Sequence, residues 1–272
     1  MRNRLRTAWL LLGVLAACSA APAPARAVII YLSTDSGATI GGLTIFDGDI
    51  ARYDTASGVA TLYFNENLFS ANEQVDSIHI RDNGNILLST TTSATLGGLT
   101  FGAGDVAEYN PNTNTASLFF AETHFASSAN IDGFTVLANG NYVISTNATE
   151  ILAGVTFRNG DLIEYNPVTD TATIFLSENL FSADEDIDAV YVMPDGSVVL
   201  STTNGATIGG LTFQDGDLVR YVPTTNTATL FLSESVFGGI NENIDGVSVP
   251  EPGTAALVAL GLAALVRRRA RA

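Results

Sequence analysis

The strongest constraint on the fold of this chain is a repeat of 56 residues. Tyrosines, phenylalanines and Ser-Thr pairs all recur at this spacing. The tyrosines are Tyr53, Tyr109, Tyr165 and Tyr221, and the phenylalanines are Phe69, Phe125, Phe181 and Phe237. Self-similarity at a fixed period indicates one structural unit repeated along the chain. Four such units fill residues 28–249 of the 272-residue sequence.

Each repeat contains four short runs rich in β-branched and aromatic residues, which is the composition of β-strands. In the third copy these runs are 187–192, 197–201, 217–221 and 227–232. The dipeptides between the first and second runs favour tight hairpins, because both of their residues readily adopt positive φ. These dipeptides are Asn83-Gly84, Asn139-Gly140 and Asp195-Gly196. The pattern predicts a four-stranded antiparallel unit in each repeat.

Four such units predict an all-β fold, a four-bladed β-propeller. The two ends of the repeat region are complementary. Residues 29–33 match the second strand of a blade that lacks its first, and residues 244–249 match a first strand without the rest of its blade. Pairing this C-terminal strand with the N-terminal blade would complete that blade and remove two exposed edges. We therefore expect a ring that is closed by its two ends.

The repeat region is strongly acidic. Residues 28–249 contain 27 Asp and Glu residues against four arginines and no lysine, so their net charge is near −23. Such a surface argues against nucleic acid and anionic lipid as partners. Cations, cationic polymers and neutral sugars stay open. Most of the acidic residues fall in the two long connections of each repeat, which share one face of a propeller, so we expect one strongly negative face.

Four aspartates at the start of the first strands form the sharpest candidate site. They are Asp76, Asp132, Asp188 and Asp245. Because the first strand of a blade is innermost, these side chains should surround one mouth of the central channel. Four carboxylates there suit a hard cation such as Ca²⁺, which takes six to eight oxygen ligands. The alternative is that each aspartate caps a turn by accepting bonds from backbone amides.

The Ile-Asp sequences at these positions resemble the strand openings of hemopexin-like four-bladed propellers. That resemblance implies an ion-holding channel. It extends to architecture only, because residues 28–249 contain neither cysteine nor tryptophan and so lack the terminal disulfide and tryptophan pattern of that family.

Other repeated positions predict structural roles. Four aspartates follow glycine-containing turns and are expected to close them; they are Asp49, Asp105, Asp161 and Asp217. The tyrosine and phenylalanine series predict packing between blades. Ion pairs between neighbouring blades are predicted for Arg52 with Glu108 and for Glu164 with Arg220. The two histidines, His79 and His124, have no recognisable nucleophile motif with them, which argues against catalysis.

The N-terminal segment predicts export. Three arginines precede the apolar run 8–17, which is too short to span a bilayer, so residues 1–27 are interpreted as a signal peptide. Cleavage is expected after Ala27. A second interpretation stays open, because Leu15-Ala16-Ala17-Cys18 resembles the bacterial lipobox, in which Cys18 would be lipidated and retained.

The C-terminal segment has three parts: a Pro-Glu-Pro sequence, an apolar run 254–266 and an arginine cluster. The tail 250–272 resembles the PEP-CTERM sorting signal of Gram-negative bacteria. The resemblance implies processing by an exosortase-type protease, with a short transmembrane segment that anchors the chain transiently in the inner membrane. The expected signal residues are Pro250, Glu251, Pro252, Arg267, Arg268 and Arg269. The arginines would stay on the cytoplasmic side.

These features together predict an exported structural or binding protein of the cell surface or extracellular matrix, without catalysis. The PEP-CTERM resemblance implies an association with exopolysaccharide, and the acidic face suggests divalent cations as partners. Two alternatives remain. One is a lectin-like carbohydrate binder that uses the acidic loops, and the other is a calcium-supported propeller hydrolase.

Overall fold

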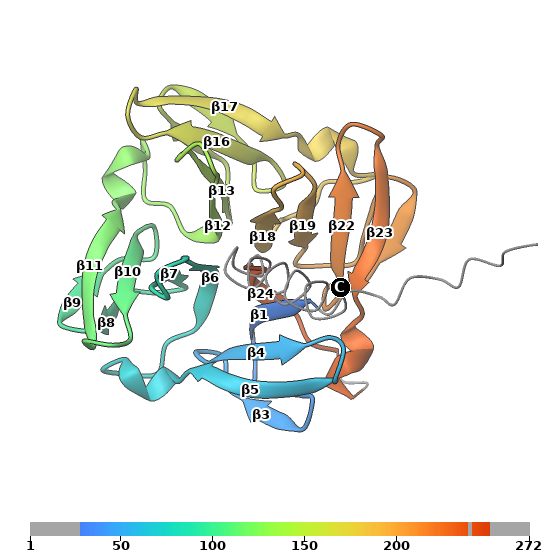
Figure 1. The fold of residues 1–272 in the computed structure, drawn as a ribbon. Coiled ribbons are helices and arrows are strands. Elements are labelled where there is room, and N and C mark those ends of the chain that lie inside the picture. The colour runs from blue at the N-terminus through green and yellow to red at the C-terminus, as the bar shows by residue number, and fades with distance from the viewer. Residues whose placement is uncertain (1–27, 239–240, 251–272) are drawn as a thin grey trace, which may run out of the picture.

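A computed structural model describes residues 28–238 and 241–250, in which the chain forms a ring of four β-sheets (Figure 1). Each sheet has four antiparallel strands, so the predicted four-bladed β-propeller is confirmed. The predicted signal peptide, Cys18 and the tail after Pro250 lie outside the described residues. Within the described ranges, no helix has the length and apolar character needed to cross a bilayer.

The strands of each blade run from the centre of the ring outward. Blade 1 consists of β24 (Ile244–Ser248), β1 (Ile29–Thr34), β4 (Ile50–Asp54) and β5 (Val59–Phe64). Blade 2 consists of β6 (Val75–Ile80), β7 (Ile86–Thr90), β10 (Val106–Asn110) and β11 (Thr115–Phe120). Blade 3 consists of β12 (Ile131–Val136), β13 (Tyr142–Thr146), β16 (Leu162–Asn166) and β17 (Thr171–Leu176). Blade 4 consists of β18 (Ala189–Val192), β19 (Val198–Ser201), β22 (Leu218–Val222) and β23 (Thr227–Leu232).

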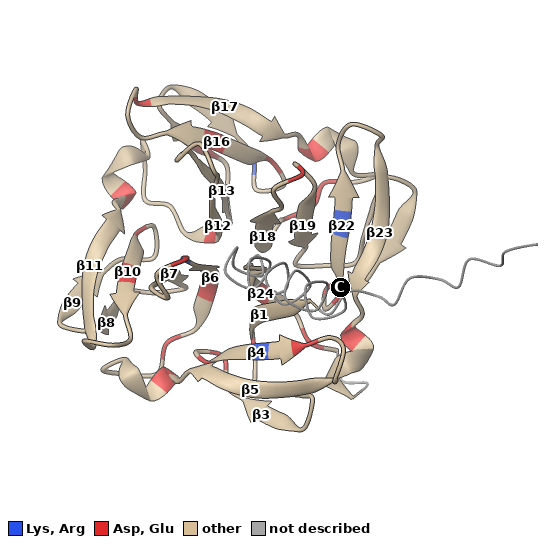
Figure 2. Ribbon diagram, in the orientation of Figure 1, with Lys and Arg blue, Asp and Glu red and all other residues tan. Residues whose placement is uncertain are grey.

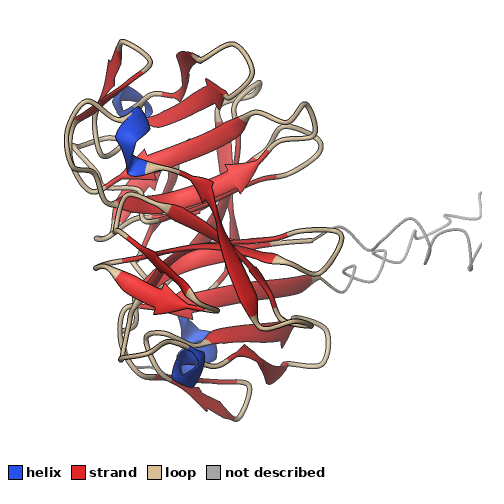
Figure 3. Cartoon of the chain, turned by 90° about the vertical axis from the view of Figure 1, so that its left-hand side faces the viewer, coloured by secondary structure: helices blue, strands red, loops and turns tan. Residues whose placement is uncertain are grey.

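The ring is closed as expected, because β24 pairs with β1 in blade 1. Tyr31 lies opposite Ser248 and Leu32 opposite Val247. The described chain therefore begins and ends on the side of the ring that carries the tight turns, here called the turn face. The opposite side carries the long connections and is called the loop face. Figure 3 shows the short helices on the loop face and the two ends of the described chain on the turn face.

The sequence did not predict the structure inside the long connections. The loop between the second and third strands of each repeat folds into a small hairpin. These hairpins are β2–β3 (Ala38–Ile40, Leu43–Ile45), β8–β9 (Ala94–Leu96, Leu99–Phe101), β14–β15 (Glu150–Leu152, Val155–Phe157) and β20–β21 (Ala206–Ile208, Leu211–Phe213). The connection between repeats contains a short 3₁₀ helix. These helices are η1 (Glu66–Leu68), η2 (Glu122–His124), η3 (Glu178–Leu180) and η4 (Glu234–Phe237).

The core lies between the blades, in four apolar clusters. Phe64 and Phe69 of blade 1, for example, pack in one cluster with Ile78 and Tyr109 of blade 2. The rings of Phe64 and Tyr109 meet edge to face, with centroids 5.5 Å apart. All members of the repeated tyrosine and phenylalanine series are buried, which confirms their predicted packing role.

The predicted ion pairs between neighbouring blades are wrong. Glu108 pairs with Arg81 of its own blade at 3.1 Å, and Arg220 pairs with Asp195 of its own blade. The tight turn after the first strand brings Arg81 and Asp195 beside the third strand, and this local approach is closer than any across the interface.

The third hairpin carries a residue that the other three avoid. Ala153 has φ of +49°, where the other hairpins place glycine, such as Gly97 with φ of +55°. We expect Ala153→Gly to stabilise the fold by about 0.5–1 kcal/mol, because strain of about 1–2 kcal/mol is relieved against the chain entropy of glycine. The reverse change, Gly97→Ala, should destabilise it, because its Cβ would lie 2.6 Å from the backbone nitrogen of Ala116. Melting temperatures of the two variants test this, and a lower value for Ala153→Gly would contradict it.

Candidate functional site

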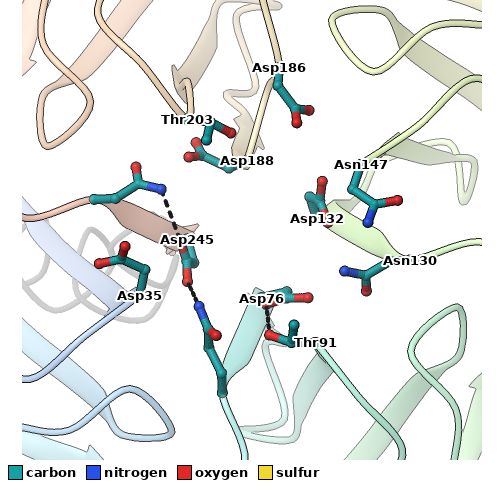
Figure 4. A pocket seen from close by; sticks show the side chains of 12 residues that line it. Asp35, Asp76, Thr91, Asn130, Asp132, Asn147, Asp186, Asp188, Thr203 and Asp245 are labelled. Atoms are coloured by element: carbon teal, nitrogen blue, oxygen red, sulfur yellow. Dashed lines mark hydrogen bonds between the residues drawn. The ribbon is translucent and has the colours of Figure 1, made fainter.

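A cavity of about 240 Å³ opens on the loop face between the innermost strands (Figure 4). Three sets of equivalent repeat positions line it. The outermost set is exposed and comprises Asp35, Thr91, Asn147 and Thr203. The middle set is partly buried and comprises Gln74, Asn130, Asp186 and Asn243. The innermost set is buried and comprises Asp76, Asp132, Asp188 and Asp245. We call this cavity the mouth and its innermost set the aspartate ring.

The mouth therefore brings together all four aspartates that the sequence singled out. Each is at most 9% exposed and extends from the start of an innermost strand or from the residue just before it. The sequence analysis missed Asp35 and Asp186, which add two carboxylates. Both follow the 56-residue step, but their counterparts are threonine, asparagine or glutamine. The signal was thus a repeated position rather than a repeated residue.

Side chains supply hydrogen bonds to three members of the ring. Thr91 Oγ1 donates to Asp76 Oδ1 at 2.7 Å, and Ser201 Oγ donates to Asp188 Oδ1 at 2.6 Å. Asp245 accepts from Gln74 Nε2 at 2.6 Å. These contacts differ from turn capping, in which backbone amides would be the donors.

Several buried oxygens in the mouth have no hydrogen-bond partner. They are Asp76 Oδ2, Asp188 Oδ2, Asp186 Oδ1, Asn130 Oδ1 and Asn243 Oδ1. All of these atoms are acceptors. Asp76 and Asp188 are only 6% exposed, so their free oxygens are poorly hydrated by bulk water. An unsatisfied buried carboxylate oxygen is costly, and a ligand that carries positive charge would satisfy it.

The electrostatics of the mouth is unfavourable in its own right, because its lining, all within the described residues, contains no basic side chain. Burial, together with repulsion from neighbouring aspartates, raises the pKa of Asp132 to about 9 and that of Asp245 to about 8. Burial is also the main reason that the pKa of Asp188 rises to about 7 and those of Asp76 and Asp186 to about 6.

The donor set fits a hard cation, since carboxylate, amide and hydroxyl oxygens are the ligands that Ca²⁺ prefers. Among the described residues, however, no three His, Cys, Asp or Glu side chains are placed to hold a metal ion directly. The cavity volume would hold about eight water molecules at roughly 30 Å³ each. A cation here would therefore keep several water ligands between itself and the more distant side chains.

The second aspartate series has the turn-closing role that its sequence predicted. Asp105, for example, accepts from the backbone amide of Gly102 and from that of Glu122, both at 2.7 Å. It thereby joins the turn before β10 to the start of η2. The same pair of bonds recurs at Asp49, Asp161 and Asp217.

We expect Asp105→Ala to destabilise the fold by about 2–4 kcal/mol, because it leaves two partly buried amides without an acceptor. Urea denaturation of the purified chain measures this change. Asp105→Asn is the matched control, because its amide oxygen can still accept one of the two bonds. A loss below about 1 kcal/mol in Asp105→Ala would contradict the structural role.

The two histidines occupy packed positions. His79 Nδ1 lies 3.1 Å from Thr135 Oγ1 and accepts from the amide of Val136 at 3.4 Å. Burial lowers the pKa of His79 to about 4, so its ring is neutral near pH 7. His124 stacks on Phe120, with ring centroids 5.0 Å apart.

Acidic residues recur in every blade, whereas basic ones mark β4 and β22 (Figure 2). Arg158 is the arginine of the loop face. It pairs with Glu178 at 2.7 Å and with Asp161 at 3.6 Å, away from the mouth. The mouth therefore has no internal cation among the described residues.

Comparison with protein-family models identifies the PEP-CTERM protein-sorting motif at residues 248–271. This confirms the sorting signal that the sequence predicted and marks the chain as an exported substrate of exosortase processing. Of the predicted signal residues, Pro250 is described and the others lie outside the described residues. No curated protein sequence matches the chain.

Solved structures match only distantly. A virginiamycin B lyase from Staphylococcus aureus is 10% identical, with 78% of this chain and 57% of that chain covered and a TM-score of 0.32. An auxiliary nutrient binding protein from Bacteroides ovatus is 10% identical, with 74% and 44% covered and a TM-score of 0.34. A protein of unknown function from Bacteroides caccae is 10% identical, with 82% and 98% covered and a TM-score of 0.36. The chain spans 23% of an extracellular domain assigned to a Bacteroides thetaiotaomicron one-component system. Likeness at this level says nothing about ligand or activity.

Proposed function

This chain carries a PEP-CTERM sorting motif after a four-bladed propeller, and on that premise we propose that it is a cell-surface or extracellular-matrix binding protein that holds Ca²⁺ in its mouth. The observation that carries the proposal is the set of unpartnered, buried acceptor oxygens among six carboxylates. A monovalent cation would neutralise only one of these charges. A divalent oxygen-seeking ion neutralises two and accepts a shell completed by water.

The proposed role of the bound ion is to link the chain to acidic extracellular polymers. The outermost lining residues are exposed, so the solvent side of the ion keeps water ligands that can be exchanged. A carboxylate or hydroxyl oxygen of a polysaccharide could take such a position. The acidic loop face would otherwise repel an acidic polymer, which makes the cation necessary for contact.

We propose no catalytic role for the chain. His79 lies inside the ring and His124 packs against Phe120, so neither histidine belongs to the mouth. A lectin would need exposed aromatic rings that stack on sugars. Of the exposed large apolar side chains in the described residues, Phe46 is the one aromatic, at 57% exposure. This gives lectin-like and hydrolase functions less support than cation binding.

Calorimetric titration of the full chain in detergent, at about pH 8 and about 0.15 M salt, tests the proposal. We expect saturable binding of one Ca²⁺ per chain, with a Kd of about 0.1–1 mM, as in extracellular calcium modules. Mg²⁺ should bind more weakly, because it demands a compact octahedral shell. Binding that does not saturate, or that disappears as added salt screens the surface, would overturn the proposal.

A further inference from the structure

The closing strand β24 differs from the other three innermost strands. Each of β6, β12 and β18 is joined to the next strand of its blade by a tight turn, whereas β24 is separated from β1 by almost the whole propeller sequence. Non-covalent contacts alone therefore hold β24 in blade 1. Its docking costs more chain entropy than that of a strand tethered by a short turn.

At the mouth, contacts from three blades hold the start of β24. Gln74 Nε2 donates to Asp245 at 2.6 Å, and Ser201 Oγ donates to the carbonyl of Ile244 at 2.7 Å. The amide of Asp35 donates to the carbonyl of Asn243 at 3.2 Å. These bonds are opposed by charge, because Asp188, Asp76 and Asp35 all repel the Asp245 carboxylate.

At the turn face, the other end of β24 leads directly into the sorting motif. Ser248 is fully buried, and its Oγ accepts from the amide of Ile80 in blade 2 at 3.0 Å. Val249 is also buried, at 3% exposure. The matched motif begins at residue 248, so no linker separates it from the fold. One strand thus connects the mouth to the processing signal.

We propose that the cation in the mouth is a clasp for β24 and thereby controls whether the segment ahead of the sorting motif is folded. The inference rests on the proposed cation site. With the ion bound, Asp245 is drawn toward the other carboxylates and β24 stays docked. Without it, repulsion acts on the strand that is least tethered, so β24 opens before any other part of the ring. Residues 248–250 are then released with it.

Hydrogen exchange of the full chain in detergent, with Ca²⁺ or with a chelator, tests the clasp. We expect Ca²⁺ to slow exchange in β24 by about tenfold or more, and in β6, β12 and β18 by less than about threefold, because local opening reports the stability of each segment separately. Equal protection of all four strands would overturn the clasp and leave the cation site standing. Absence of saturable Ca²⁺ binding in calorimetry would overturn both.

A substitution at the far end of β24 gives a second, independent readout. Ser248→Ala removes the acceptor of the Ile80 amide without touching the mouth, so it should loosen β24. Because coupling between two sites is reciprocal, it should also weaken Ca²⁺ binding, by about three- to tenfold. Thr135→Ala is the matched control, since Thr135 is buried at the equivalent position of β12, a strand tethered by its turn. Equal affinity losses in the two variants would contradict the clasp.

Discussion

Thermal unfolding of the chain in chelator should shift to lower temperature as the pH rises from about 6.5 to about 9, and saturating Ca²⁺ should remove most of that shift. The raised pKa values in the mouth are the cause. The folded state binds protons on Asp76, Asp132, Asp186, Asp188 and Asp245 at pH values at which the unfolded chain, with aspartate pKa values near 3.8, has lost them. Stability therefore falls with rising pH until the folded-state values are passed.

The size of the effect follows from the smallest shifts in the mouth. Asp76 moves from 3.8 to about 6, which alone corresponds to about 3 kcal/mol of lost stability. For a domain of this length, about 3 kcal/mol lowers the melting temperature by about 6–12 °C. Ca²⁺ competes with the protons for the same oxygens, so its binding should release protons and flatten the pH dependence.

The pH window separates this effect from two others. Surface carboxylates are ionised in both states above about pH 6.5, so they add no slope there. His79 has a lowered pKa, of about 4, so it reduces stability only as the pH falls below its unfolded value of 6.5. A melting temperature in chelator that stays constant between about pH 6.5 and about 9 would contradict the electrostatic description of the mouth.

Replacing one aspartate of the ring should stabilise the chain in chelator and weaken its response to Ca²⁺. For Asp188→Asn at about pH 8, the upper bound of the gain is about 4 kcal/mol, from a pKa raised from 3.8 to about 7. The amide oxygen can still accept from Ser201, but a buried amide has its own desolvation cost, so the measured gain should be smaller. The affinity for Ca²⁺ should fall by about tenfold, because ligand charge sets affinity in such sites.

Asp184→Asn is the matched control for Asp188→Asn. Asp184 is exposed on the same face, so the substitution changes the net charge equally without reaching the mouth. It should alter both stability and Ca²⁺ affinity only slightly. Opposite signs for stability in chelator and for Ca²⁺ affinity cannot come from general damage to the fold. If Asp188→Asn destabilises the chain in chelator, Asp188 is structural and the mouth is not a strained cation site.

The two aspartate series show how differently one residue type can act in a single fold. Asp105 and its equivalents accept backbone amides, so their charge is stabilised and their removal should cost stability. Asp188 and the other ring members face one another with too few donors, so neutralisation should stabilise them. Both series follow the repeat, and the sequence placed one at turns and the other at the channel.

The sequence by itself determined the blade unit, the number of blades and the closure of the ring. These features depend on local patterns, namely alternating strands, Asn-Gly and Asp-Gly turns, and complementary ends, and such patterns are legible in the order of residues. The hairpins such as β8–β9 were missed because three-residue strands are stabilised by neighbours rather than by their own composition.

Tertiary structure alone decided the chemistry of the mouth. Whether Asp76 is exposed or buried, and whether its Oδ2 finds a donor, depends on the approach of four blades that are 56 residues apart in sequence. Asp35 and Asp186 joined the site for the same reason, since their counterparts in other repeats are uncharged. Desolvation and charge repulsion act through space over a few ångströms, so a linear sequence gives the positions of the carboxylates but not the cost of bringing them together.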